Sequence, residues 1–248
     1  LEWGNATQYT SIQVSEAMAE FGKKGLNASQ ILEVMAGNMS LAAAGELTLA
    51  EAASFTMGII NQFGLELSDA QMLADTLAMA ASNSATGVKA IAAAMNNTGL
   101  QAKVAGLSVK DTTIALMMLA EQNLEGSRAG TYMMNALKSL QVMAPKTQKG
   151  FENLGININE FRDSTTGQIT NFFGLITAMK ESGATGAQLA KMFPTQALKA
   201  MQVLVETDTD ELERFKKIMA DTTGASKEMA DRLLDGPVGT MIRFESVT

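Results

Sequence analysis

Four times along this chain, a stretch with helical periodicity ends in a glycine followed by a large apolar residue: Gly25-Leu26, Gly64-Leu65, Gly106-Leu107 and Gly155-Ile156. Helices often end with a glycine in the left-handed conformation, where a Cβ atom would cost energy, and the next residue packs back on the last turn. Three of these apolar residues follow another apolar residue by five positions, as this contact requires: Leu26 follows Phe21, Leu65 follows Ile60 and Ile156 follows Phe151. No strand-like segment precedes the glycines, which argues against phosphate-binding loops. We therefore expect Gly25, Gly64, Gly106 and Gly155 to be structural helix ends.

The segment 106–140 has the pattern of one helical hairpin. Ser108 is placed to cap a first helix, and a second apolar stripe follows the break at Gly126-Ser127. Similar helix pairs begin after Gly25 and Gly64, with capping boxes expected at Thr48/Glu51 and Ser68/Gln71. Successive helix-end glycines are 39, 42 and 49 residues apart. This spacing indicates a weak repeat of about 40 residues and predicts an all-α fold, an irregular array of packed helical hairpins.

The helical-repeat pattern changes at Pro145, which is placed to begin a short helix. Between residues 155 and 170 apolar and polar residues alternate around the turn signal Asp163 to Gly167, which predicts a small β-hairpin or an extended loop. We expect two domains, a helical-hairpin repeat region at 1–144 and a smaller, mostly helical lobe at 145–248. Trp3 is expected to anchor the first helix, and Gly236-Pro237 to end the last one.

Composition excludes several classes of function. The chain has no Cys and no His, so it cannot hold a Ser-His-Asp triad, an HExxH zinc site or a Cys-ligated metal. A net charge of −7 argues against specific nucleic-acid binding, and no apolar run reaches the 18 residues of a membrane span. The sequence starts with Leu1 and stops within a pattern at Thr248, so we expect a fragment of a longer chain.

The carboxylate pairs Glu16/Glu20 and Glu121/Glu125 lie at i,i+4 and could act as acid and base or bind a cation. Exposed like charges on a solvated face explain them better, since nothing apolar surrounds them. We therefore identify no catalytic residue, no cofactor site and no metal site. The 18 methionines could mark an adaptable partner surface, with core filling as the simpler reading. The candidate interaction surface is the stripe of Met117, Met118, Met133 and Met134.

Several motifs resemble the core region of phage tail tape measure proteins. They are Phe63-Gly64-Leu65, Ala74-Asp75-Thr76-Leu77-Ala78, Ser84, Gly106-Leu107-Ser108 and the Gly-Ser-x-Ala-Gly-Thr turn from Gly126 to Thr131. The likeness extends more weakly through Leu154-Gly155-Ile156 to Met229-Ala230. It departs from the family pattern at Pro194, where a glycine is common.

The resemblance implies a virion structural protein of a phage or prophage, located in the tail lumen or at the tail tip and assembled in the host cytoplasm. It implies roles in tail assembly, tail-length determination and DNA passage. The implied partners are further copies of the chain, for example in a trimer, and tail tube, tail-tip and tail assembly chaperone proteins. The resemblance supplies no catalytic residue and no cofactor. Two alternatives stay open: a cell-wall-degrading enzyme module and a free-standing helical-repeat protein-binding module. The glycine spacing favours a compact assembly or tip module over an extended ruler.

Overall fold

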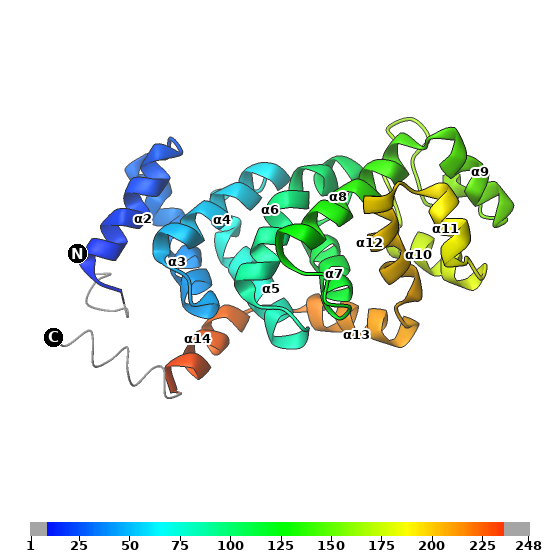
Figure 1. Cartoon of the computed structure of the whole chain (residues 1–248). Coiled ribbons are helices and arrows are strands. Elements are labelled where there is room, and N and C mark those ends of the chain that lie inside the picture. Colours follow the sequence, from blue (N-terminus) through cyan, green and yellow to red (C-terminus); the bar gives the residue numbers. More distant parts are fainter. Residues whose placement is uncertain (1–8, 236–248) are drawn as a thin grey trace. The chain divides into compact units, whose positions relative to one another are not determined.

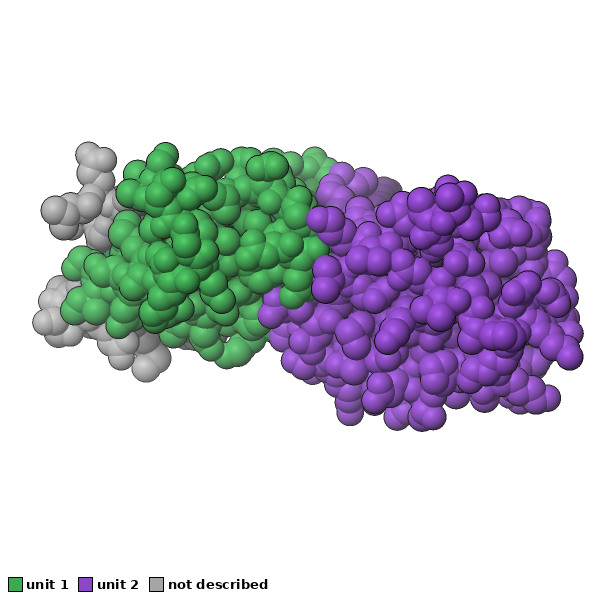
Figure 2. Space-filling view, turned by 90° about the horizontal axis from the view of Figure 1, so that it is seen from above, with its two compact units in different colours: residues 1–83, 87–89, 221–248 green, residues 84–86, 90–220 purple. Residues whose placement is uncertain are grey.

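The computed structural model describes residues 9–235, and within that range the regular structure is helical, with no β-strand (Figure 1). Two compact units make up the chain, and Figure 2 colours them separately. Unit 1 comprises residues 1–83, 87–89 and 221–248, and unit 2 comprises residues 84–86 and 90–220. Unit 2 is therefore an insertion between two distant segments of unit 1. The boundary expected at 144/145 lies inside unit 2, and Trp3 and Gly236-Pro237 lie outside the described residues.

Unit 1 is a group of helices around an apolar core. Its elements are α2 (Ser11–Lys23), α3 (Ala28–Gly45), α4 (Leu49–Phe63), the 3-10 helix η1 (Leu67–Asp69), α5 (Ala70–Asn83) and α14 (Ala225–Asp235). Helix α3 packs against α4, α5 and α14, and α2 packs against α4. Fully buried side chains such as Phe21, Met35, Ile59 and Leu77 fill the space between them. Because α3 contacts every other element of this unit, including α2 and η1, it organises the unit.

Unit 2 contains the remaining helices. They are α6 (Val88–Ala105), of which all but the first two residues belong here, α7 (Val109–Ala120), α8 (Gly126–Val142), α9 (Pro145–Asn153), the 3-10 helix η2 (Ile158–Glu160), α10 (Phe172–Glu181), α11 (Gly186–Met192), α12 (Thr195–Glu206) and α13 (Thr209–Ala220). Helix α12 packs against α7, α8, α10 and α11, and α9 packs on α11. The centre of this unit is therefore α12, whose buried face includes Ala197, Ala200, Met201 and Leu204.

All four glycines expected at helix ends have left-handed backbone conformations. Their φ angles are 89° at Gly25, 64° at Gly64, 92° at Gly106 and 70° at Gly155. The following residue donates its backbone N–H to a carbonyl five positions earlier: Leu26 to Phe21 at 3.2 Å, Leu65 to Ile60 at 3.0 Å, Leu107 to Ala102 at 2.9 Å and Ile156 to Phe151 at 3.0 Å. This is the six-to-one bond of the Schellman helix end, which satisfies carbonyls left over by the helix.

The helix starts are set by short polar side chains. Thr48 and Glu51 form the expected capping box on α4, and the Ser108 hydroxyl accepts the Asp111 N–H at 3.0 Å at the start of α7. The cap expected at Ser68 is wrong, because Ser68 lies inside η1 and α5 begins two residues later. The Asp69 carboxylate accepts the Glu66 N–H at 3.0 Å and so closes the 3-10 turn in its place.

The segment between residues 155 and 170 contains the 3-10 helix η2 followed by a loop with a single antiparallel bridge between Arg162 and Ile169. Asp163 accepts the backbone N–H groups of Thr166 at 2.7 Å and Thr165 at 2.8 Å, which lowers the pKa of the Asp163 carboxyl. Ile169 donates its N–H to the Ala105 carbonyl at the end of α6, at 2.7 Å. This bond ties the part of the loop around Ile169 to α6. The pairing between Arg162 and Ile169 does not extend into strands.

Helix α14 returns to unit 1 from the far end of the chain, and a buried carboxylate holds it there. Asp75 in α5 is 5% exposed and accepts hydrogen bonds from the N–H groups of Gly224 at 3.1 Å and Ser226 at 3.0 Å. The Gln71 side-chain amide also donates to Asp75, at 3.1 Å. Backbone N–H groups at a helix start favour an anion, so α5 supplies the charge that the start of α14 needs.

Within the range 9–235, the helices are too short or too polar to cross a lipid bilayer.

Candidate functional site: a lysine-lined groove between α9 and α11

Helix α9 begins at Pro145, whose fixed φ suits the first helical position. Its inner side buries Thr147 and Phe151, and its outer side carries Lys146 and Lys149. The charged side chains must stay in water while the two buried ones pack inward, so the helix exposes a basic face.

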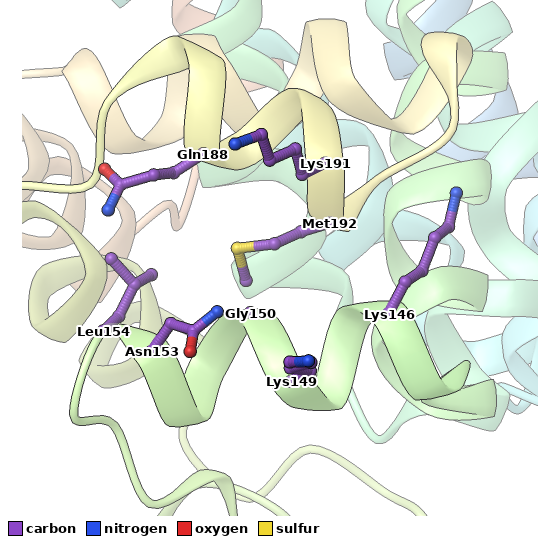
Figure 3. Close-up of a pocket in the computed structure, with 8 residues that line it drawn as sticks. All are labelled: Lys146, Lys149, Gly150, Asn153, Leu154, Gln188, Lys191 and Met192. Carbon is purple, nitrogen blue, oxygen red and sulfur yellow. The ribbon is translucent and has the colours of Figure 1, made fainter.

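Helix α11 lies across from α9 and is also short. Thr185 and Gln188 form a capping box at its start, and Leu189 and Met192 are its buried residues. The helix ends at Met192 because Pro194 follows, and the residue before a proline is driven out of the helical conformation. Lys191 is exposed, lies near Gln188 and lines the hollow between the two helices (Figure 3).

Three contacts fasten the two helices together. The buried Thr147 hydroxyl donates to the Met192 carbonyl at 2.8 Å. The rings of Phe151 and Phe193 meet edge to face, with centroids 6.5 Å apart and planes at 83°. A Cβ atom on Gly150 would lie 2.1 Å from the Met192 Cγ, so the methionine side chain rests on bare α9 backbone. These contacts fix Met192 as the floor between the helices.

Above this floor is a groove of about 450 Å³ (Figure 3). It is lined by Lys146, Lys149, Gly150, Asn153, Leu154, Gln188, Lys191 and Met192. A second hollow of about 310 Å³ shares Lys146 and is lined by Asn135, Lys138, Ser139, Val142, Ala144, Thr147 and Pro194. Neither lining contains an Asp or Glu, and Val142 in the second hollow is 67% exposed. We call these two hollows, which share Lys146, the lysine groove.

The chemistry of the lysine groove suits binding of an anion that carries apolar groups. Among the described residues, Lys138, Lys146, Lys149 and Lys191 form no ion pair within 4.0 Å. Their ammonium groups can therefore meet carboxylates or phosphates from another molecule. The side chain of Val142, which is 67% exposed, offers apolar contact beside these charges, whereas Met192 is only 1% exposed. The groove has the character of an interaction surface.

The methionine stripe lies elsewhere in unit 2 and is mostly core. Met117, Met118 and Met133 are 0%, 1% and 0% exposed, and Met134 is partly exposed. Helix α7 packs against α8, α12 and α13, so residues 112–120 are all buried and no face of this part of the helix remains free. In this fold the four methionines do not form an exposed surface.

The carboxylate pairs do not form acid–base sites. Glu16 is exposed, and the partly exposed Glu20 pairs with Lys23 at 2.6 Å. Glu121 and Glu125 do not share a helical face, because α7 ends at Ala120 and α8 begins at Gly126. In the part of the chain that the structure describes, no three His, Cys, Asp or Glu residues come together as metal ligands.

Sequence reasoning missed the lysine groove. Lys149 and Lys191 are 42 positions apart, so only the packing of α9 on α11 brings them together. The one local signal was Lys146 and Lys149 at i,i+3 after a helix-opening proline, which places both on one face.

Comparison with known proteins gives three matches. Residues 1–193 match a family model described as phage-related minor tail protein. The chain is 24% identical over 241 residues to the tape measure protein of Pneumococcus phage Dp-1, covering 95% of this chain and 21% of that protein. It is 23% identical over 248 residues to the probable tape measure protein of Escherichia phage P2, covering 98% of this chain and 30% of that protein. The chain thus spans less than a third of the length of these relatives. No solved structure matches it significantly.

Proposed function

Because this chain belongs to the phage-related minor tail protein family, we propose that it is a folded structural segment of a phage or prophage tail tape measure protein. In this role it takes part in tail assembly, in setting tail length and in DNA passage. Two relatives that align with nearly the whole chain carry tape measure names, and this supports the proposal. The role is structural, and the membership of a tail protein family favours it over an enzymatic one.

The contact of α14 with α5 supports the proposal that the segment is folded and is not an extended ruler. The hydrogen bonds between Asp75 and Ser226 join residues 151 positions apart, which an extended chain could not do. Between residues 9 and 235 no helix exceeds 18 residues. A single straight helix of 248 residues would be roughly 370 Å long. The segment therefore contributes a folded body, made of two compact units, to the tail.

We place this body in the tail lumen or at the tail tip, after assembly in the host cytoplasm. Its partners in this proposal are tail tube, tail-tip and tail assembly chaperone proteins, together with further copies of the chain. The sequence of the family relatives supports a tail location, and the compact fold supports the interaction role.

An in-frame deletion of the segment from the phage genome, followed by electron microscopy of the tails, tests the proposal. Missing or malformed tails are the expected result for a folded assembly module. Tails shorter by roughly 370 Å would instead identify an extended ruler. Normal tails of normal length would overturn the tail function altogether.

A point variant in the same assay distinguishes a folded module from an extended ruler. Gly130→Leu blocks the close approach of α8 to α6, where even a Cβ atom would lie 2.3 Å from the Ala94 carbonyl oxygen. A folded module should then give malformed tails, like the deletion. An extended helical ruler tolerates leucine well, so normal tails in this variant would contradict the folded-module proposal. Gly22→Leu, at an exposed helical glycine with open space around it, is the matched control.

A further inference from the structure

We infer that the hollow between α9 and α11 is a binding site for the phosphate backbone of double-stranded DNA, and that it binds DNA of any sequence. The inference rests on the proposed function for its biological setting, because a tail protein meets the genome as the DNA passes. It deepens that function by naming the surface that contacts the DNA. Binding through phosphates alone depends on salt and lets a protein slide along a duplex, so it is compatible with passage.

The two segments that form this hollow are basic, although the whole chain is acidic. Residues 126–151 contain four basic residues and no acidic one, and residues 182–205 contain two basic residues and no acidic one. Within unit 2, α8 packs on α12 and α9 packs on α11, which brings the two segments together. By sequence, unit 1 has 14 acidic and 6 basic residues, so the acidic excess lies there. The net charge of −7 therefore does not describe the surface around the hollow.

Three lysines supply the positive charge of the hollow. Lys146 and Lys149 lie three positions apart on α9, which separates them by about 4.5 Å along the helix axis, and Lys191 comes from α11. All three side chains are exposed, and among the described residues none of them pairs with an acid. A duplex carries one negative charge per about 1.7 Å of its axis, so several phosphates can meet these ammonium groups together.

Two amide side chains add neutral donors to the lining. The Gln188 Oε1 atom accepts the N–H and the hydroxyl of Thr185 at 2.9 and 2.8 Å, which leaves the Gln188 Nε2 group to donate elsewhere. Asn153 on α9 also lines the hollow (Figure 3). The lining contains no Asp or Glu. A set of N–H donors without a carboxylate suits a ligand that consists of acceptor oxygens, as a phosphate backbone does.

The hollow offers little apolar contact, which favours DNA over an acidic protein segment. Met192 is only 1% exposed, because Thr147 and Gly150 hold it against α9. Leu154 is half-buried, and the exposed Val142 belongs to the second hollow. Stable protein contacts usually have an apolar centre, whereas binding to a phosphate backbone depends on charge.

The lining also favours a duplex over a single strand. It has no aromatic side chain on which an unpaired base could stack. It has no arginine for a bidentate contact with a base edge, and lysine binds phosphate as a point charge. The contact is therefore with the backbone alone, and it carries no preference for a base sequence.

Fluorescence anisotropy of the purified chain with a labelled duplex of about 20 base pairs tests the inference. We expect binding at low salt that weakens steeply between about 50 and 200 mM salt, because each phosphate contact releases counterions. Two duplexes of unrelated sequence should bind equally well.

The triple variant Lys146→Gln/Lys149→Gln/Lys191→Gln should raise the Kd at least about tenfold and lower the slope of log Kd against log salt by about 3. Lys24→Gln/Lys217→Gln/Lys227→Gln removes the same charge at exposed positions outside the hollow and should bind like the parent. Both variants should keep the helical circular dichroism of the parent, since all six lysines are exposed.

Several results would overturn the inference. They are an absence of duplex binding at low salt, equal effects of the two triple variants, and a Kd that depends on base sequence. Binding of tripolyphosphate without binding of the duplex would assign the hollow to free phosphates. Displacement of the duplex by a glutamate peptide of equal charge would assign it to an acidic protein segment. Each of these failures leaves the tail-deletion experiment unaffected, and normal tails after the deletion would remove the tail function without changing the measured DNA binding.

Discussion

The carboxylate of Asp75 accepts a hydrogen bond of 2.5 Å from the hydroxyl of Ser226, across 151 residues of sequence. Both groups are buried, and two backbone N–H groups at the start of α14 and the Gln71 amide complete the shell around the acid. Within the described residues no cation pairs with Asp75. Directed hydrogen bonds and the positive end of a helix therefore take the place of an ion pair.

Replacing Asp75 should loosen α14 selectively. Asp75→Ala leaves four donors without their acceptor, and hydrogen bonds to a charged group are strong, so we expect the free energy of unfolding of unit 1 to fall by about 3 kcal/mol. Denaturant titration measures this loss, and amide exchange in α14 should accelerate first. Asp231→Ala, at an exposed position of α14, should change stability by less than about 0.5 kcal/mol. Equal effects of the two substitutions would contradict the anchoring role.

The same glycine-to-alanine substitution should lower stability at one helical position and raise it at another. Gly130→Ala forces a Cβ atom against Ala94 and Asn97 of α6, and overpacking of this kind costs about 2 kcal/mol. Gly22→Ala meets open space in α2 and should raise stability by about 0.5 to 1 kcal/mol, because alanine favours the helix. Thermal unfolding of both variants checks the pair. A stabilising Gly130→Ala would mean that α8 and α6 do not approach closely.

Two left-handed glycines allow backbone strain to be separated from side-chain crowding. Gly25 and Gly106 have φ angles of 89° and 92°, but only at Gly106 would a Cβ atom meet neighbours, with the Ile169 carbonyl oxygen 3.0 Å away. Gly25→Ala should therefore cost about 1 to 2 kcal/mol from the backbone alone. Gly106→Ala should cost more, as measured by denaturant titration, because it also disturbs the loop that Ile169 ties to α6. If the two costs are equal, that loop does not press on the helix end.

Acid should remove the stabilisation that Glu51 provides. Its contact with the Lys89 ammonium, 2.8 Å away, and its bonds with Thr48 lower the pKa of Glu51 from 4.5 to about 2. The folded-state pKa lies below that of the unfolded chain, so the contribution is fully present above about pH 4.5 and disappears as the pH falls towards 2. Glu51→Gln should thus be less stable than the parent near neutral pH, with the difference narrowing through this range. The stability difference between Lys89→Met and the parent should also narrow over this pH range. If the difference for either variant stays constant with pH, the proposed link between the Glu51 pKa and stability is wrong.

Helix ends were readable from the sequence because short-range contacts decide them. Thr48 and Glu51 lie three residues apart, and Gly64 needs only its own φ angle and the Leu65 bond back to Ile60. The failure at Ser68 is equally local. Asp69 competes by accepting the Glu66 N–H, and the chain forms a 3-10 turn before α5 can start.

Features that depend on which helices pack against each other could not be predicted from the sequence. The stripe of Met117 and Met133 looked like one face, yet partners on several sides bury most of it. Gly130 was assigned to a turn, but it lies inside α8, where the missing side chain lets α6 approach. The domain boundary was placed at a change of texture near Pro145. In the structure the chain passes between the two units near residues 84–90 and at 220/221, and the C-terminal segment returns to unit 1 with α14.

The insertion of unit 2 between two parts of unit 1 determines how the chain would carry mechanical load. Residues near 11 and near 235 both belong to unit 1, so tension applied between them acts first on the contacts that hold α2 and α14 in that unit. Unit 2 lies outside that path until the bonds of Asp75 to the start of α14 break. Once α14 is detached, the same tension would pass through unit 2, so the Asp75 contact shields unit 2 from the load.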